Sequence, residues 1–174
     1  MAAPPIIVPH PDPAGPLPSL PCGVITVSDT RTLADDRSGQ VIVDALAAAG
    51  HAIVERVVLR DEPTAIAATV AEWVARGNLG AILLTGGTGL APRDTTYEAI
   101  AGLLEREIPG FGELFRSLSF QEIGSRAMAS RAVAGVRDRT LIFSMPGSAK
   151  ACRLAMEALI LPELVHLSRL LGGG

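Results

Sequence analysis

Apolar residues along this chain recur with two spacings, which alternate from one segment to the next. Short apolar runs occupy residues 23–28, 52–59, 81–84 and 141–144, and such runs are typical of buried strands. Between the runs, apolar residues return every three or four positions, as on one face of a helix. Strands that alternate with helices predict right-handed crossovers. The expected fold class is therefore α/β with a mainly parallel sheet.

Residues that begin and end helices flank the first two helical segments. Ser38 is placed to cap the first helix, and Gly50 to end it. The second helix is expected to open at Pro63 or Thr64, because proline is tolerated in a first turn, and to stop at Gly77. These signals predict one helix after each of the first two strands.

Three further helices are expected in the second half of the chain. Thr95 and Glu98 have the spacing of a capping box, which marks a helix start. A shorter helix is expected around residues 113–120, and Ser148 is placed to cap a long final helix. Pro162 should kink that helix, because proline lacks the N–H that a helix interior needs.

The first 22 residues differ from the rest because they hold eight of the thirteen prolines. Proline does not suit a helix interior or a central strand. We therefore expect residues 1–21 to form a disordered or extended arm, with a single domain over residues 22–174. An arm that lies on a neighbouring subunit is the alternative. A body of about 150 residues can bury one substantial core.

Composition argues against several classes of function. Charged residues make up 19% of the chain, hydrophobic residues 48%, and the net charge is −3. No cluster of Lys and Arg offsets phosphates, so no nucleic-acid partner is expected. No apolar run approaches the ~18 residues of a membrane span, and no secretory signal is visible. These features predict a cytoplasmic protein without membrane contact. Cys22 and Cys152 lie far apart and the three histidines are scattered, which gives no metal-ligand spacing.

The strongest functional signal is a glycine-rich loop after the strand at residues 81–84. Its members are Thr85, Gly86, Gly87, Thr88 and Gly89. Glycine permits close approach of a ligand, and exposed N–H groups beside Thr hydroxyls can surround a phosphate. The loop is not a P-loop, which needs a Lys after the glycines, nor a dinucleotide fingerprint, whose last position is Pro92 here. A simple glycine turn is the alternative to ligand binding.

A second strand-to-helix junction contains Pro146, Gly147, Ser148 and Lys150. The Ser148 hydroxyl would lie at a helix N-terminus, where the helix dipole favours anions. A Lys in the first turn works against that dipole unless an anion is near, so Lys150 is interpreted as a phosphate contact. The alternative is a solvated surface lysine, with Ser148 serving only as a cap.

Two more polar loops follow strands. Ser28 and Asp29 begin one loop, and Asp61 lies in the other. Because ligands of open parallel sheets bind beyond the carboxyl ends of the strands, we expect all four loops to lie together there. Asp61 and Asp94 would then supply the hard oxygen ligands that Mg²⁺ uses beside substrate phosphates. Alternatively, the first loop is an ordinary solvated connection and Asp61 is a helix cap or turn residue.

Taken in order, these loops resemble the MoaB/MogA family of molybdenum cofactor biosynthesis. The segments that carry the resemblance are residues 26–29, 60–63, 84–89, 93–94, 108–113 and 145–148. The resemblance covers about residues 22–170. Residues 120–125 and 130–136 look closer to the MoaB branch than to MogA.

The resemblance implies a three-layer α/β/α fold that assembles as a homotrimer or homohexamer. Active family members are adenylyltransferases, which transfer AMP from Mg-ATP to the phosphate of molybdopterin and release pyrophosphate. Molybdopterin is then a substrate, Mg²⁺ accompanies ATP, and later-stage cofactor assembly proteins are candidate partners. Asp61 and Asp94 occupy the two acidic positions associated with activity. The chain departs from the usual pattern at Thr96 and Tyr97, where a small or apolar residue and Pro are commoner.

Two rival functions remain beside the transferase. A non-catalytic molybdopterin carrier or assembly subunit would use the same pocket without turning over ATP. A molybdate-inserting protein of the MoeA type shares the fold, but it carries large extra domains that this sequence does not contain.

Overall fold

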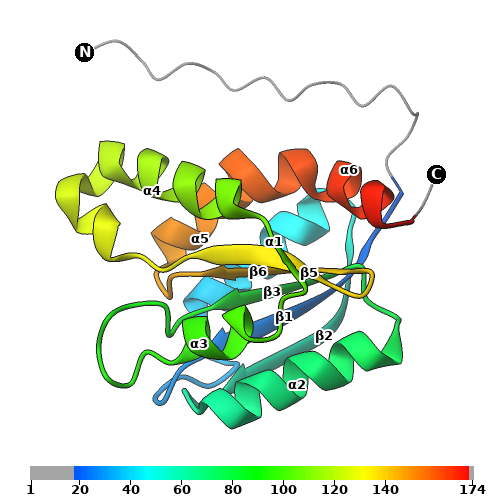
Figure 1. Cartoon of the computed structure of the whole chain (residues 1–174), viewed down its shortest axis with the longest axis horizontal. Helices are drawn as coiled ribbons and strands as arrows, with labels where there is room; N and C mark the ends of the chain where they lie inside the picture. The colour runs from blue at the N-terminus through cyan, green and yellow to red at the C-terminus, as the bar shows by residue number, and fades with distance from the viewer. Residues whose placement is uncertain (1–17, 173–174) are drawn as a thin grey trace.

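The computed structural model describes residues 18–172, which fold into a six-stranded sheet with helices on both faces (Figure 1). The strands are β1 (Pro21–Val27), β2 (Ala52–Leu59), β3 (Ala81–Thr85), β4 (Arg106–Glu107), β5 (Val133–Arg137) and β6 (Thr140–Met145). Their order in the sheet is β2-β1-β3-β6-β5-β4. The first four of these are parallel, and β5 runs antiparallel to both of its neighbours. The mainly parallel sheet is confirmed.

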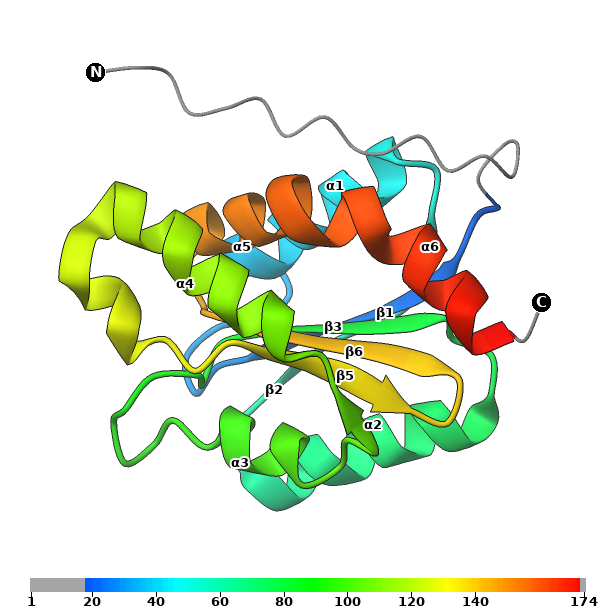
Figure 2. The same ribbon diagram turned by 45° about the horizontal axis from the view of Figure 1, so that its top comes forward.

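Two groups of helices cover the two faces of the sheet (Figures 1 and 2). One face carries α1 (Arg37–Ala48), α4 (Pro109–Ile123), α5 (Ala149–Ala155) and α6 (Leu161–Gly172), and the other carries α2 (Pro63–Arg76) and α3 (Thr96–Ala101). Strand β3 shows why its run is continuously apolar. Leu83 packs in the core under the first group, while Ile82 and Leu84 pack under the second. The three layers follow from this double burial.

The expected arm falls largely outside the described residues, which begin at residue 18. Pro21 already belongs to β1. The N–H of Leu20 donates to His51 Nδ1 at 3.2 Å, and its carbonyl accepts from Ala52 N at 3.0 Å. Across residues 18–172, no helix has the length and apolar character that crossing a membrane requires.

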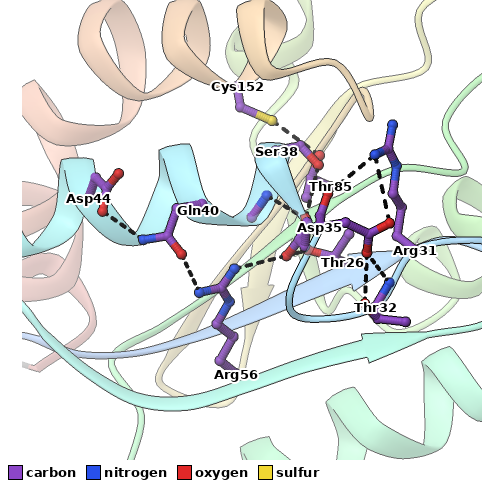
Figure 3. A network of polar contacts seen from close by, with 12 residues as sticks. Thr26, Arg31, Thr32, Asp35, Ser38, Gln40, Asp44, Arg56, Thr85 and Cys152 are labelled. Carbon is purple, nitrogen blue, oxygen red and sulfur yellow. Dashed lines mark hydrogen bonds and ion pairs between the residues drawn. The ribbon is translucent and has the colours of Figure 1, made fainter.

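Helix α1 begins differently from the prediction. Asp36, not Ser38, is its cap, and the Asp36 carboxylate accepts from Gly39 N at 2.8 Å. The same buried carboxylate accepts from Thr26 Oγ1 at 2.8 Å and from Arg56 Nη2 at 3.2 Å. Thr26 and Arg56 are labelled in the polar network of Figure 3. This tertiary anchoring fixes the start of the helix, which a local serine signal could not reveal.

The capping box predicted at the start of α3 is not formed. Thr95 holds the cap position, but its hydroxyl donates to Asp61 Oδ1 at 2.6 Å instead of capping the helix. Glu98 pairs with Arg131. Both side chains therefore bind partners that are distant in sequence instead of capping the helix. Helix α3 ends at Ala101.

Most other helix signals agree with the structure. Pro63 is the first residue of α2, Gly77 ends it with a left-handed φ of 66°, and Ser148 Oγ caps α5 by accepting from Ala151 N at 3.1 Å. Helix α4 is longer than the predicted 113–120 and continues into the 3₁₀ helix η1 (Gly124–Ala129). The kink predicted at Pro162 corresponds to a break in the final helix. A π-helical turn, η2 (Met156–Ile160), ends two residues before Pro162 and separates α5 from α6.

Candidate functional site

The four polar loops meet at the carboxyl edge of the parallel strands. Ser28 N donates to Leu59 O at 2.8 Å, which joins the loops after β1 and β2. Gly86 N donates to Met145 O at 3.0 Å, which joins the loops after β3 and β6. Asp61 N donates to Asp29 Oδ1 at 3.1 Å. The sequence-based expectation that these loops lie together is confirmed.

Neighbouring protein atoms occupy the space that a side chain on Gly86 or Gly87 would need. Gly86 and Gly87 have φ values of 103° and 66°. A Cβ on Gly86 would lie well inside van der Waals contact with the backbone carbonyl oxygen of Val27. On Gly87 it would collide with Thr96 Oγ1 and lie 2.5 Å from Asp61 Oδ2. Both positions therefore require glycine for the loop's own fit against the protein.

A cavity of about 460 Å³ opens between the glycine loop, the loop after β6 and the α4–η1 segment. Its lining includes residues 86–89 of the glycine loop, Asp94 and residues 146–148 on one side. Phe115, Ile123 and Ala127 form an apolar wall on the other. Such a cavity suits a flat heterocycle on the apolar side and a polar or anionic group on the loop side.

Asp94 is the one carboxylate among the described residues that line this cavity. Its Oδ2 accepts from Ala91 N at 2.9 Å and would lie 2.6 Å from a Cβ on Gly89. Its Oδ1 accepts no hydrogen bond from any residue between 18 and 172. Asp94 therefore has one oxygen held in place by the loop and one available to a ligand.

Asp61 lies behind the glycine loop and does not line the cavity. It is buried, and its Oδ1 accepts from Thr95 N at 3.1 Å and Thr95 Oγ1 at 2.6 Å. The structure thus separates the two aspartates that the sequence grouped. Asp94 reaches the cavity, whereas Asp61 ties the loop after β2 to the start of α3.

Asp29 is held by an arginine at the outer side of the loops. Arg93 Nη2 lies 2.9 Å from Asp29 Oδ2, and Arg93 Nη1 donates to Glu62 Oε1 at 3.0 Å. The Arg93 guanidinium lowers the pKa of the exposed Asp29 carboxyl, with help from the hydrogen bond of Asp61 N. Asp29 therefore serves as an anchor between loops in this structure.

Thr85 and Lys150 lie outside the cavity. Thr85 is buried, and its hydroxyl donates to Pro146 O at 3.0 Å and lies 3.1 Å from Cys152 Sγ. Burial raises the pKa of the Cys152 thiol to about 11, so this sulfur stays protonated at neutral pH. Lys150 Nζ lies 3.3 Å from Glu122 Oε2 on α4.

Two arginines contribute to the site although no sequence motif marks them. Arg126 lines the cavity from η1. Arg131 holds the glycine loop: its Nε donates to Gly89 O at 2.9 Å, its Nη2 to Asp94 O at 2.8 Å, and its backbone N to Thr88 O at 3.2 Å. No local signal marks Arg131, because its partners lie about forty residues earlier.

The donors present limit how a metal ion could be held. No cluster of three or more His, Cys, Asp or Glu that could hold a metal occurs in the described part of the chain. Magnesium, however, commonly binds to one or two carboxylates, substrate phosphates and water. The free Oδ1 of Asp94 fits that mode, in which Mg²⁺ arrives with a nucleotide.

Comparison with known proteins assigns the family. The family described as "Probable molybdopterin binding domain" matches residues 23–166. The chain belongs to the MoaB/MogA family of molybdenum cofactor biosynthesis proteins. Molybdenum cofactor biosynthesis protein B of Halalkalibacterium halodurans is 52% identical over 149 residues, which cover 85% of this chain and 88% of that protein.

Two further MoaB proteins agree with this membership. The Escherichia coli K12 protein of the same name is 48% identical over 141 residues, covering 81% of this chain and 83% of the relative. A crystal structure of molybdenum cofactor biosynthesis protein B superposes with a TM-score of 0.88 at 44% identity, covering 91% of this chain and 99% of that one. The MoaB/MogA family fold, a three-layer α/β/α arrangement, is thereby confirmed.

Proposed function

We propose that this MoaB/MogA-family protein transfers AMP from Mg-ATP to the phosphate of molybdopterin and releases pyrophosphate. The observation that carries the proposal is the cavity of about 460 Å³, which combines an apolar wall with a peptide-lined loop and one free carboxylate oxygen. Its volume falls in the roughly 300–1,000 Å³ range of small-molecule sites. The apolar wall suits the pterin, and the loop suits its phosphate.

In the proposed reaction, an oxygen of the molybdopterin phosphate attacks the α-phosphorus of ATP. A new P–O bond forms, the bond between the α-phosphorus and its bridging oxygen breaks, and pyrophosphate leaves with that electron pair. The nucleophile is already ionised at neutral pH, so the protein needs no general base. It must hold two anionic reactants in line, which is a matter of positioning.

The chain's own residues would divide that task. Residues 87–89 of the glycine loop and Ser148 line the cavity, and their backbone N–H groups and the Ser148 hydroxyl would orient phosphate oxygens. Asp94 Oδ1 would hold Mg²⁺, which offsets charge on the triphosphate when bound with ATP. Asp61 would act as a positioning residue, because it supports the loop through Thr95.

One assay tests the proposal against the carrier alternative. The full-length protein is incubated with molybdopterin and Mg-ATP, and pyrophosphate release is measured. Asp94→Asn should lower turnover roughly 10²- to 10³-fold, since a few kcal/mol of transition-state stabilisation is lost, while pterin affinity persists. Asp138→Asn is the matched control, because Asp138 is exposed at the opposite edge of the sheet and Asn tolerates its φ of 51°.

Each other outcome has a defined meaning. No pyrophosphate release, with pterin bound tightly, identifies a carrier and ends the transferase proposal. Near-normal turnover of Asp94→Asn removes the metal-binding role from Asp94. Loss of pterin affinity in that variant would make Asp94 a pterin contact instead.

We also propose that the chain works as a homotrimer or homohexamer in the cytoplasm. Four large apolar side chains on α4 and η1 are more than half exposed, namely those of Leu114, Phe120, Ile123 and Met128. A patch of this kind suits an interface. A light-scattering mass near 18.0 kDa at micromolar concentration would contradict assembly.

A further inference from the structure

A second, smaller cavity of about 230 Å³ lies beside the first. It opens between the loop after β1 and the loop after β6. The residues that line it are Thr26, Val27, Ser28, Arg31, Arg37, Ser38, Gly147, Ser148 and Ala149. Val27, Gly147 and Ser148 line both cavities. The two cavities therefore meet at these three residues.

The charge of the second cavity is positive. Arg31 and Arg37 line it, and none of its lining residues is acidic. The Arg37 guanidinium pairs with no other residue in the 18–172 range. Arg31 Nη1 donates to the backbone oxygen of Asp35 at 3.2 Å and makes a long 4.0 Å ion pair with the Asp35 carboxylate, in which both side chains are about half exposed (Figure 3). Such exposed contacts are weak, so Arg31 can turn to an anion.

The nearby buried carboxylate of Asp36 does not cancel this charge. Asp36 Oδ2 accepts from Thr26 Oγ1 at 2.8 Å and forms a 3.2 Å ion pair with Arg56. Its Oδ1 is used by the start of α1, through Gly39 N at 2.8 Å. The aspartate is thus neutralised by Arg56, which leaves the Arg37 guanidinium without an acidic partner among residues 18–172 and Arg31 with only its exposed contacts to Asp35.

Two hydroxyl groups of the cavity have a proton available for a ligand. Ser28 Oγ accepts from Thr30 N at 3.3 Å and from Arg31 N at 3.1 Å. Ser148 Oγ accepts from Ala151 N at 3.1 Å. Neither hydroxyl donates to another residue between 18 and 172, so each can donate to a ligand oxygen, whereas the hydroxyls of Thr26 and Ser38 donate to Asp36. Two guanidinium groups and two hydroxyl donors make a site for an anion rich in oxygen.

We infer that this second cavity holds the β- and γ-phosphates of ATP and the pyrophosphate that leaves, an inference that rests on the proposed AMP transfer. Its volume is below the roughly 300 Å³ at which whole-ligand sites begin, so it suits a fragment of a nucleotide. It has no aromatic or large apolar wall for a ring, unlike the first cavity. The α-phosphate then lies near Ser148, where the two cavities meet and the bond changes occur.

The two arginines would stabilise charge where it develops. When the bond between the α-phosphorus and the bridging oxygen breaks, that oxygen keeps the electron pair and pyrophosphate gains negative charge. Guanidinium groups remain charged at any physiological pH and match phosphate oxygens in pairs. The same contacts make free pyrophosphate a ligand in the absence of pterin and ATP.

The test is calorimetric binding of inorganic pyrophosphate to the full-length protein, with and without Mg²⁺. Arg37→Gln and Arg31→Gln should each weaken pyrophosphate binding about 10-fold, since each removes a charge-assisted contact. Arg106→Gln is the matched control, because Arg106 is exposed on β4 and lines neither cavity. Molybdopterin affinity should be the same in all four proteins. Thermal melting checks that each variant is folded, as expected for exposed side chains.

Three results would overturn the inference. The first is that the wild-type protein fails to bind pyrophosphate at millimolar concentration. The second is that Arg37→Gln binds pyrophosphate as tightly as wild type. The third is that, of the arginine variants, only Arg126→Gln has a weakened pyrophosphate affinity. The last result would place the anion in the larger cavity. Arginine-dependent pyrophosphate binding without AMP transfer would defeat the proposed function and leave this subsite standing, so the two failures are distinguishable.

Discussion

Two glycines with positive φ lie in the loops at the amino end of the parallel strands, and two more lie in the loop at the carboxyl end. The two pairs differ in the protein atoms that surround them. At the amino end, Gly50 and Gly77 have φ values of 83° and 66°, and a Cβ on either would meet nothing within 4 Å. At the carboxyl end, a Cβ on Gly86 or Gly87 would collide with neighbouring protein atoms. Positive φ alone marks a turn. Positive φ inside packed surroundings marks a loop whose shape is fixed by several elements at once.

Cavities at the two ends differ in the same sense. A cavity of about 540 Å³ lies at the amino end, larger than the 460 Å³ cavity at the carboxyl end. Two of its polar side chains are bound within the fold: Thr140 Oγ1 donates to Leu79 O at 3.1 Å, and Arg139 Nη2 donates to Gly172 O at 3.0 Å. The side chains of Asn78, Asp138 and Ser168 also line it and make no such bond within residues 18–172. Neither volume nor a free carboxylate therefore distinguishes the candidate site. Its packed glycine loop and its position beyond the carboxyl ends of the parallel strands do.

The largest expected loss of stability is for alanine at a glycine of the carboxyl end, compared with alanine at a glycine of the amino end. Gly86→Ala should destabilise the protein by about 4 kcal/mol or prevent folding, because φ strain adds to a collision with the Val27 carbonyl, which no rotamer change relieves. Gly77→Ala, the matched control, should lose only about 1 kcal/mol from the strained φ. Urea unfolding of both variants measures the difference. Equal losses would show that packing around Gly86 is not tight in solution.

A smaller effect is expected at Arg131, which holds the site loop without lining the cavity. Arg131→Met removes the donors to Gly89 O and Asp94 O, so the loop should loosen and pterin affinity should fall about 10-fold. Arg131→Lys should restore little, because a point charge cannot reach both carbonyls. The neighbouring Arg116, which makes one 3.4 Å bond to Ser130 O, provides the control Arg116→Met.

Hydrogen exchange separates loop positioning from a general loss of stability. In Arg131→Met, amides of residues 86–90 should exchange faster while those of β1 and β3 keep their protection. A uniform increase across the sheet would instead give Arg131 a purely structural role. Full rescue by lysine would also contradict the proposed geometry.

Much of the sheet could be predicted from the sequence because its signals are local. Strand β2 has the predicted bounds, 52–59, and the glycine loop follows β3 as expected. The rule that ligands bind beyond the carboxyl ends of parallel strands then predicted that the candidate loops meet at this edge, without any contact information. Strand β4, with two residues, and β5, which contains Gly135, have too little apolar pattern to be recognised.

The errors at the helix caps and at the two aspartates share another physical cause, which is competition between local and distant partners. Ser38 and Thr95 both have the local pattern of a cap, but Asp36 is fixed by Arg56, and Thr95 is bound by Asp61. The roles of Asp61 and Asp94 look alike in sequence, since each follows a strand. They separate only when the fold places one behind the loop and the other in the cavity. Long-range hydrogen bonds of this kind produce no periodic pattern in the sequence, so they cannot be predicted from it.

The smallest predicted effect concerns His51, a buried histidine at the amino end. Its Nδ1 accepts from Leu20 N at 3.2 Å, and burial lowers the pKa of the imidazole below its ordinary 6.5. Between the folded and unfolded pKa values, the unfolded chain binds more protons than the folded one. Stability from this group is therefore complete above pH 6.5 and is lost as the pH falls through the lower, folded-state pKa.

Glutamine in place of His51 tests whether the amino end of the sheet is independent of the binding end. His51→Gln keeps an acceptor for Leu20 N but has no proton to gain, so its melting temperature should fall less than that of wild type between pH 7.5 and 5.5. An equal decrease of melting temperature in the two proteins would mean that burial does not lower the pKa of His51. Pterin and pyrophosphate affinities at pH 7.5 should be the same in both, because His51 lines neither cavity at the carboxyl end. A changed affinity would show that the two ends are coupled through β1, and the division of the molecule into a structural end and a binding end would then fail.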